Sequence, residues 1–474
     1  MGSGQMGKPV FSVLDDDGCD RLHRAAVQVL ADVGIEVRGE RALKLLDRTG
    51  SHVSGTRAYI PRQVIDQTLE MVPRHFLLPG RNDDGSLDLD VRPGAKYFGN
   101  GTDCLYMQDP RSGERRRAVL ADVEMSAALC ELLPNIDFVM SAVLPADVPL
   151  DELELAQFGA MVKNTRKPVI ISPATGGETL VAMQEMAALA GRPESFACLA
   201  MSNPPLVLDC ACLGKAIAAA ELGIPFILGP GLQMGATGPA SVAGSSVLSH
   251  AECLAAMVIH QHAAPGAPFL YGAGVAPLDM RTMVEAWAWP ETHLGLAACC
   301  DVATWLGLPS WSYAGTSDAK SHDGQWASEA AATMMLAGLS NATLLHDVGE
   351  FESGVQNSLE SVVFADTLIG YVRRLLSGVE LTPEAMQVND VAQVGPGGHF
   401  LARSYTRAHH REVWRSPFFD TSLHGHWLAN GSPTLSDRLH DTTQALLESR
   451  EPLLPDDVQS HIDRLSGGAV RRRQ

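Results

Sequence analysis

Hydrophobic positions change their spacing twice along the chain, and these changes divide it into three parts. In the first part, residues 1–95, the segment 19–33 places Leu22, Ala26 and Val33 on one face of a helix. Two more helices are expected at 42–49 and 61–72, and short strands within 77–91. This part is predicted to form an N-terminal cap of helices and strands.

From residue 96 the pattern becomes an alternation of short β-type runs and longer helical segments. The strands are expected at 97–99, 138–142, 169–172, 197–201, 225–228, 269–272, 310–313 and 342–345. The helices are expected at 120–133, 152–164, 177–190, 209–222, 241–263, 292–306, 323–339 and 358–376. Eight strands alternating with eight helices is the count of an α/β fold, the (β/α)8 or TIM barrel, placed here at residues 96–378. A doubly wound open sheet is the alternative, but no G-x-G-x-x-G motif follows a strand in the context that such a fold needs.

The third part, residues 379–474, loses this alternation. It is rich in His, Arg and Trp and ends in two helical segments, 435–449 and 455–465. We expect a C-terminal helical extension that packs on the barrel.

The composition limits the class of protein. Hydrophobic residues make up 46% of the 474 residues, which supplies a large core and excludes a disordered chain. The formal charge of −19 argues against nucleic acid or an anionic membrane as the main partner and is compatible with a cationic ligand. No segment has the pattern of a secretory signal, and the most apolar stretch, 241–262, is interrupted by Glu252. The nine cysteines lie mostly in apolar segments, so we expect free thiols in a cytoplasmic protein.

The loops that follow the predicted strands are where a barrel places its active site. They are rich in glycine, which lets backbone approach a ligand closely. The small polar side chains in these loops that we expect to bind substrate are Asn100, Asp103, Gln233, Thr316 and Ser317.

Two groups near strand exits are candidates for catalysis. His346 closes an apolar strand, and the alternative for it is a buried core histidine. Asp318, Gln325 and Glu329 form a polar group at the entry to a helix. The competing interpretation is that Asp318 or Asp323 only caps that helix.

Aromatic side chains are scarce, at 6% of the chain, and four of them lie on or next to predicted strands. Tyr97, Tyr271, Trp311 and Tyr313 are therefore candidates to contact substrate, although aromatic residues at such positions most often serve packing. Residues two apart on a strand face the same side, so Trp311 and Tyr313 are expected to share one side of the sheet.

No metal site is predicted. The chain has neither a Cys-x-x-Cys nor a His-Glu-x-x-His motif, and its paired histidines, such as His260 and His262, lack the spacing of a helical zinc site. A nucleophile elbow and a Walker loop are also absent. The residue patterns alone therefore predict a barrel enzyme for a small ligand, without an obvious nucleophile.

Several segments together resemble the trimethylamine:corrinoid methyltransferase family, over about residues 10–465. These segments are 313–320 with Asp323, Gln325 and Glu329 after it, the loop 229–239, residues 99–103 followed by 109–116, and the tail segments 399–401 and 418–420 with Trp427.

The resemblance implies a (β/α)8 barrel that moves a methyl group from a methylated amine to the cobalt of a corrinoid carried by a separate protein. Members that act on trimethylamine carry pyrrolysine, whereas this chain has only standard residues. The chain is therefore similar to the branch without pyrrolysine, which takes quaternary amines such as glycine betaine. The expected partners are a small quaternary amine and a cognate corrinoid protein that supplies cobalamin, and the chain is expected to be a homo-oligomer.

Quaternary amines explain the missing nucleophile and acid. The leaving group is a neutral tertiary amine, so the protein has to orient the N–CH3 bond and desolvate the cation. Aromatic rings and carboxylates suit the cation, and His346 or backbone N–H groups can hold the carboxylate of a betaine. The alternatives are a barrel demethylase of another N-methylated acid that uses tetrahydrofolate as acceptor, and a non-catalytic betaine-binding protein.

Overall fold

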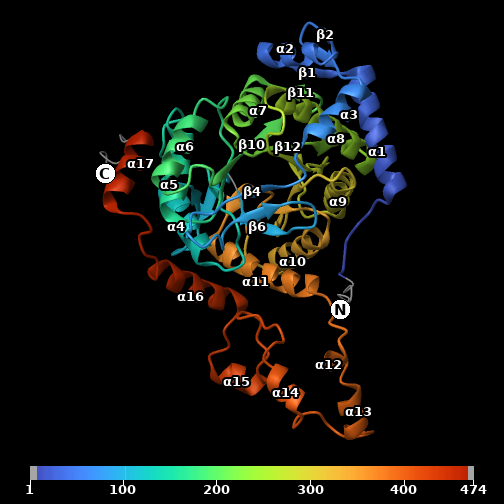
Figure 1. Cartoon of the computed structure of the whole chain (residues 1–474). Coiled ribbons are helices and arrows are strands. Elements are labelled where there is room, and N and C mark those ends of the chain that lie inside the picture. The colour runs from blue at the N-terminus through green and yellow to red at the C-terminus, as the bar shows by residue number, and fades with distance from the viewer. Residues whose placement is uncertain (1–7, 102, 468–474) are drawn as a thin grey trace.

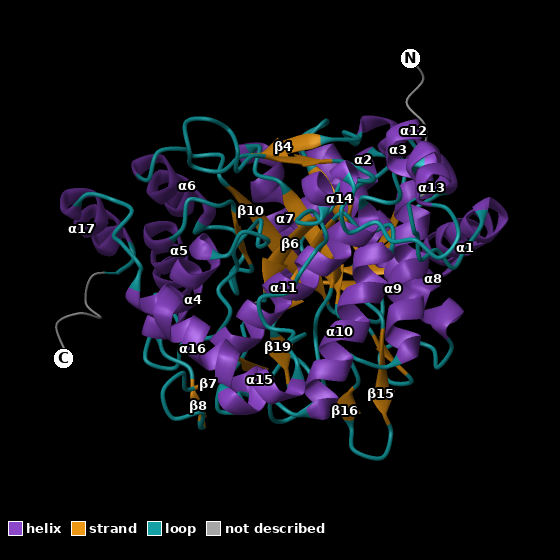
Figure 2. Cartoon of the chain, turned by 90° about the horizontal axis from the view of Figure 1, so that it is seen from below, coloured by secondary structure: helices purple, strands orange, loops and turns teal. Residues whose placement is uncertain are grey.

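A curled, seven-stranded parallel sheet forms the centre of the molecule, and helices surround it (Figures 1 and 2). The computed structural model describes residues 8–101 and 103–467. The strand order is β6-β18-β17-β14-β12-β10-β9. The strands are β6 (Tyr97–Asn100), β9 (Val169–Ile171), β10 (Phe196–Ser202), β12 (Phe226–Pro230), β14 (Phe269–Gly272), β17 (Ser310–Tyr313) and β18 (Leu344–Val348).

Both edges of this sheet meet the segment around Phe138. Isolated parallel bridges pair Gly99 with Phe138 and Val139 with Val169. The sequence predicts a full strand at 138–142, but the backbone there forms only these bridges. Asn100 replaces part of the missing ladder, because its side-chain amide donates to the carbonyl of Met140 at 2.9 Å and accepts from the Met140 N–H at 2.7 Å.

Each predicted helix of the alternating part is present, with ends within three residues of those expected. They are α4 (Leu120–Leu132), α5 (Leu153–Asn164), α6 (Leu180–Leu189), α7 (Cys210–Leu222), α8 (Val242–Ala263), α9 (Pro290–Trp305), α10 (Gly324–Leu339) and α11 (Leu359–Leu376). Within the described residues, α8 alone is long and apolar enough to cross a membrane. It contacts α1, α7 and α9, and 78% of its most apolar window is buried, so its hydrophobic residues serve the core.

The first part of the chain covers one side of the helical ring and closes the amino end of the sheet. It contains α1 (Asp16–Gln28) with a π-helical turn at Val29–Val33, α2 (Glu40–Arg48), α3 (Arg62–Met71), and the strands β1 (Ile35–Val37), β2 (His52–Ser54) and β3 (Arg57–Tyr59), which join β11 (Val207–Leu208) in one sheet. The hairpin of β4 (Phe76–Leu78) and β5 (Leu89–Val91) packs its Phe76, Leu78, Leu89 and Val91 against residues inside the curled sheet, Trp311 among them.

The opposite, carboxyl end of the sheet carries short accessory strands. They are β7 (Tyr106–Gln108), β8 (Arg115–Arg117), β13 (Gln233–Met234), β15 (Ala276–Asp279), β16 (Val284–Glu285), β19 (Glu350–Phe351) and β20 (Gln356–Asn357). They are built from the loops that leave β6, β12, β14 and β18, so these long loops are ordered by pairing with one another.

The last part of the chain divides into packed and protruding segments. Helix α16 (Leu435–Glu448) packs on α4 and α11, and α17 (Asp456–Leu465) packs on α5 and α6. Residues 379–434, here called the C-terminal arm, stand away from the ring below α10 and α11 in Figure 1. The arm carries α12 (Pro383–Met386), α13 (Val388–Val394), α14 (Ser404–His409) and α15 (His424–Ala429). Among its residues only Phe418 is buried, so α16 and α17 pack on the surrounding helices whereas the arm does not.

Candidate functional site

A cavity of about 260 Å³ lies at the carboxyl ends of the parallel strands. Residues from β10, β12, β17 and β18 and from the loops after β6, β9 and β14 line it. The backbone of the loop after β14 lies very close to the backbone at the end of β12. At Gly274, for example, a Cβ atom would lie 1.6 Å from the carbonyl oxygen of Pro230, so only glycine fits there.

Aromatic rings form one wall and the floor of the cavity. Trp311 and His346 stack with ring centroids 4.1 Å apart and an interplanar angle of 12°. Trp287 packs against Tyr313 at 5.2 Å, and all four side chains line the cavity. Trp311 and Tyr313 face the same side of β17, as the two-residue repeat of a strand predicts.

The charged lining of the cavity is acidic. It contains Asp103, Glu285 and Asp347, and no Lys or Arg is among the described lining residues. Burial raises the pKa of the Glu285 carboxyl, whose Oε2 accepts a hydrogen bond of 3.2 Å from the Gln233 amide. The Asp103 carboxylate accepts hydrogen bonds from Ser141 Oγ at 3.0 Å and from Gln157 Nε2 at 3.1 Å. The cavity therefore favours a positively charged ligand.

The backbone at Asp347 turns this side chain toward the cavity. Consecutive residues of a strand face opposite sides, yet His346 and Asp347 both line the cavity. Asp347 has φ +61°, a left-handed conformation that costs a non-glycine residue about 1–2 kcal/mol. Its Oδ1 lies 2.5 Å from Nδ1 of His346, at an angle that is not that of a hydrogen bond. Strain of this kind is typical of functional sites.

Several buried polar atoms at the exits of β17 and β18 have no hydrogen-bond partner within the described residues. They include the Tyr313 hydroxyl, the Thr316 hydroxyl and both amide atoms of Asn357. Burial, followed by the nearby carboxylates Glu285, Asp347 and Asp318, raises the pKa of Tyr313 well above its ordinary value, so the phenol stays protonated and can donate. Buried polar groups left unpaired are rare, and they point to a ligand or ordered water here.

Asp318 lies behind the cavity wall rather than in the lining. Its carboxylate accepts hydrogen bonds from the backbone N–H groups of Trp287 at 3.0 Å and Ala288 at 3.1 Å, and from Ser353 Oγ at 2.9 Å. Asp318 therefore holds in place the segment that carries Trp287.

Glu329 supports this loop in turn. Its Oε2 accepts from Ser317 Oγ at 2.7 Å and from the Asp318 N–H at 2.8 Å, while Gln325 donates to its Oε1 at 2.9 Å. The cap of α10 is Asp323, which accepts from the N–H groups of Gln325 and Trp326. Of the two aspartates that the sequence offers as the cap, the structure thus selects Asp323.

Of the nine predicted substrate-binding residues, Asp103, Trp311 and Tyr313 line the cavity and six do not. Gln233, Thr316 and Ser317 are in the loops next to the lining, and the other three are Tyr97, Tyr271 and Asn100. Tyr97 is at the amino end of β6, where its hydroxyl accepts from the Asp90 N–H at 3.1 Å. Tyr271 faces the helix layer, where its hydroxyl lies 3.1 Å from Nδ1 of His250. Asn100 is fully buried at the Met140 contact. Successive side chains of β14 face opposite sides of the sheet, and Leu270 points inward, so Tyr271 faces the helices.

Among the lining residues that the sequence prediction missed are Asp347, Glu285 and Trp287. Glu285 ends β16 and Trp287 follows it closely. The β15–β16 hairpin is an insertion between β14 and α9, and no local pattern connects it with the cavity. The only signal is the pair of tryptophans, Trp287 and Trp289, in a short loop before Pro290.

Metal ligation has no support in the part of the chain that the structure describes. No group of three or more His, Cys, Asp or Glu side chains lies where it could hold a metal ion, and the nine cysteines are free.

Comparisons with known proteins agree over almost the whole chain. The profile of the family described as trimethylamine methyltransferase (MTTB) matches residues 4–471. The chain is 30% identical to glycine betaine methyltransferase of Desulfitobacterium hafniense, over 94% of each chain, and 27% identical to trimethylamine methyltransferase MttB of Methanosarcina barkeri, over 96% of this chain and 95% of the relative. The crystal structure of monomethylamine methyltransferase (MtmB) of Methanosarcina barkeri superposes with a TM-score of 0.54 at 14% identity, covers 93% of this chain and 88% of its own, and shows a shared fold. The chain is therefore a methyltransferase that belongs to the trimethylamine methyltransferase (MTTB) family.

Proposed function

We propose that this enzyme moves a methyl group from a quaternary amine to the cob(I)alamin of a corrinoid protein, and that glycine betaine or a related betaine is the amine. The observation that carries the proposal is the cavity, which combines the faces of Trp287, Trp311 and Tyr313 with carboxylates and has no Lys or Arg among its described lining residues. Such a set attracts a cation that cannot donate a hydrogen bond. The glycine betaine methyltransferase relative supports the choice of amine.

The aromatic faces and the two carboxylates Glu285 and Asp347 are proposed to bind and orient the trimethylammonium group. His346, against Trp311, is proposed to donate a hydrogen bond to the carboxylate of the betaine, and Tyr313 is a second donor because its hydroxyl has no partner among the described residues. The leaving amine is neutral, so no side chain has to supply a proton. Asp318, Gln325, Glu329 and Ser317 are proposed as positioning residues for the wall that contains Trp287.

The corrinoid is proposed to arrive with a partner protein, and its reduced cobalt supplies the nucleophile. The rim of the cavity fits such a partner, because apolar side chains stand exposed there: Met201 is 46% exposed, and Met280, Met283 and Val284 stand exposed around the tip of the β15–β16 hairpin. Exposed apolar residues gathered at the mouth of a site are typical of a docking surface.

Three structural proposals accompany this function. The bridges at residues 138–139 support closure of the sheet into a full (β/α)8 barrel. The chain is proposed to divide into a cap (1–95), a barrel (96–378) and a C-terminal extension (379–474), and to work as a cytoplasmic homo-oligomer.

The test is to mix the purified enzyme with cob(I)alamin and a panel of amines, and to follow the absorbance change to methylcobalamin. The panel contains glycine betaine, longer betaines, choline and trimethylamine. We expect methylation with a betaine and none with trimethylamine. Methylation of tetrahydrofolate without corrinoid would support the demethylase alternative, and tight binding without any transfer would support the binding protein; either result would overturn the proposal.

A further inference from the structure

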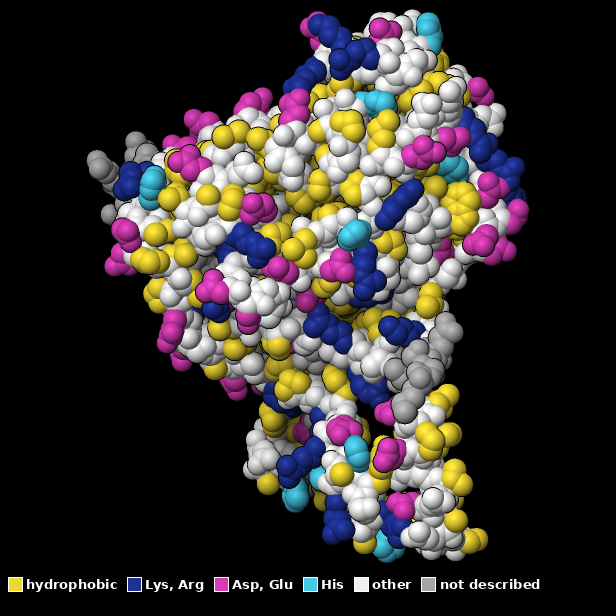
Figure 3. Space-filling model, in the orientation of Figure 1, with side chains coloured by type: hydrophobic (Ala, Val, Ile, Leu, Met, Phe, Trp, Pro, Cys, Tyr) yellow, Lys and Arg dark blue, Asp and Glu magenta, His cyan; other side chains and the backbone are white. Residues whose placement is uncertain are grey.

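The C-terminal arm exposes hydrophobic side chains that its own chain does not cover. Eleven of the 26 large hydrophobic side chains that are exposed within the described residues lie on the arm, although the arm holds only residues 379–434. Leu401 is 79% exposed and Leu423 is 72% exposed. Figure 3 shows these side chains spread over the protruding lower part of the molecule. A density of apolar surface far above that of the rest of the chain indicates an interface.

The arm cannot stabilise its own helices. None of α12, α13, α14 or α15 contains a buried residue, and the longest of them has seven residues. Helices of this length are unstable in water unless another surface packs against them. The arm therefore needs a partner to hold its structure.

Charge is separated along the arm into two opposite halves. Residues 379–398 contain Glu380, Glu384 and Asp390 and no Lys or Arg. Residues 399–434 contain four arginines, at 403, 407, 411 and 415, against Glu412 and Asp420. An arm with one acidic and one basic half is complementary to a second arm turned through a two-fold axis, because each half then meets the opposite half of the other copy.

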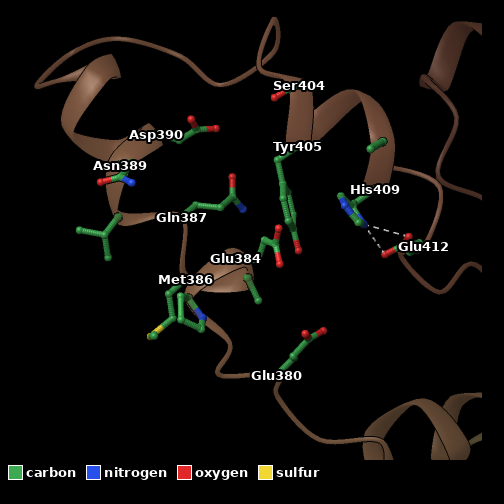
Figure 4. A pocket seen from close by; sticks show the side chains of 14 residues that line it. Glu380, Glu384, Met386, Gln387, Asn389, Asp390, Ser404, Tyr405, His409 and Glu412 are labelled. Carbon is green, nitrogen blue, oxygen red and sulfur yellow. Dashed lines mark hydrogen bonds and ion pairs between the residues drawn. The ribbon is translucent and has the colours of Figure 1, made fainter. Parts of the chain in front are cut away.

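Figure 4 shows a hollow that is lined by carboxylates from both halves of the arm. A hollow of about 1040 Å³ lies between α12, α13 and α14, and four carboxylates line it: Glu380, Glu384, Asp390 and Glu412. Asp390 pairs with Arg403, and Glu412 pairs with His409, but Glu380 and Glu384 form no ion pair within the described residues. In the same part of the chain Arg407, Arg411 and Arg415 also form none. Each arm thus presents unused carboxylates and unused arginines.

The start of the arm, with α12 and α13, lies at the end of the sheet opposite the cavity (Figure 2). Helix α11 follows β18 and leads back from the cavity end, so the arm begins at the end of the sheet that the β4–β5 hairpin closes. In Figure 2, α12 and α13 lie toward that hairpin, whereas α15 lies toward β16 and β19, at the cavity end. A protein that docks at the cavity can meet α15, but it leaves α12, α13 and the surface around them uncovered (Figure 2).

We propose that the C-terminal arm joins two copies of this chain, and that the acidic hollow of each arm receives arginines 407 and 411 of the other copy. The exposed leucines and valines of both arms then bury one another around this contact. The inference is independent of the substrate and of the methyl acceptor.

Light scattering and sedimentation of the full chain test the first consequence. We expect an even multiple of the 50.6 kDa chain mass. Two variants then reverse the charge of one half of the arm each. One is Arg407→Glu with Arg411→Glu, and the other is Glu380→Arg with Glu384→Arg. Each variant alone should dissociate with a Kd raised at least about tenfold, because like charges then face each other across both contacts.

Mixing the two reversed variants gives the decisive result. Each copy now offers the charge that the other lacks, so hetero-assemblies should form in the mixture and be visible by native mass spectrometry with one copy tagged. The matched control is Arg38→Glu, just before α2, with Arg41→Glu on α2. This helix is far from the arm in Figure 1, so the control should leave the assembly unchanged. A wild-type chain that stays monomeric at about 100 µM, reversed variants that assemble as the wild type does, or a mixture that stays dissociated would each overturn the proposal.

Discussion

The cavity region and the C-terminal arm use hydrophobic and charged residues in opposite ways. At the cavity, Trp311 is 1% exposed, and the acidic side chains stand on ordered strands and hairpins that the chain itself covers. On the arm, hydrophobic side chains are exposed, and charges of opposite sign that form no ion pair within the described residues lie in two separate halves of the sequence. The comparison contrasts a cavity whose described lining comes from one chain with an arm that, on our proposal, a second copy completes.

Replacing one tryptophan in each region should separate them most clearly. Trp311→Ala removes the ring that lies under the cavity, so we expect the free energy of unfolding to fall by about 3–5 kcal/mol and kcat/KM to fall at least about 100-fold. Trp427→Ala on the arm is measured in the Arg407→Glu and Arg411→Glu background. It should lower the free energy of unfolding by less than about 1 kcal/mol, because this ring is only half-buried. Thermal and denaturant unfolding measure the stability of both variants. Equal losses of unfolding free energy would contradict the contrast between the cavity and the arm.

Two histidines, one that lines the cavity and one in the core, test whether the cavity side chains serve activity rather than stability. His346→Ala should cut activity at least about tenfold, which is about 1.4 kcal/mol, and leave the thermal transition nearly unchanged. The control is His260→Ala, because His260 is fully buried, stacks on Phe226, and has a pKa lowered to about 3 by burial. That variant should lose about 2–3 kcal/mol of stability and keep its specific activity. If His346→Ala unfolds as readily as His260→Ala, His346 is a core histidine.

The sequence predicts the seven strands of the curled parallel sheet well, because they are buried on both faces and stand out as short apolar runs, such as Val169–Ile171. It fails at residues 138–142, where hydrogen bonds from one distant side chain, Asn100, take the place of a ladder. It cannot find Glu285 or Trp287, since their place depends on how a hairpin folds over the sheet. It also cannot separate the arm from α16 and α17, because exposure depends on contacts that no local pattern encodes.

The cavity carboxylates predict a pH dependence of substrate binding. Burial raises the pKa of Glu285, so a falling pH protonates this group before an ordinary glutamate and removes a negative charge that faces the cation. KM for the quaternary amine should therefore rise as the pH falls from about 8 to about 5, while kcat changes less. Glu285→Gln should raise KM about fivefold at pH 8 and flatten the profile.

A flat KM profile in the wild type, or an unchanged slope in Glu285→Gln, would remove Glu285 from the binding site. The matched control is Glu252→Gln, another buried glutamate, whose pKa burial raises to about 7 but which binds Ser202 and the Leu206 N–H instead of the cavity. Because the folded pKa of Glu252 lies above its unfolded value, its proton stabilises the fold at low pH, and that contribution is lost as the pH rises toward 7. Its substitution should therefore change the pH dependence of stability and leave KM unchanged.

The smallest expected effect distinguishes two aspartates at the entry to α10. Asp318→Asn weakens the hydrogen bonds that hold Trp287 and Ala288, so we expect kcat/KM to fall about threefold to tenfold, with a change in tryptophan fluorescence on binding of the amine. Asp323→Asn alters the cap of the same helix and keeps a good capping residue, so stability should change by a few tenths of a kcal/mol and activity should not change. Because both substitutions remove one negative charge from the same loop, a difference between them isolates the geometry of Trp287. Equal activities in the two variants would show that the wall of the cavity does not depend on Asp318.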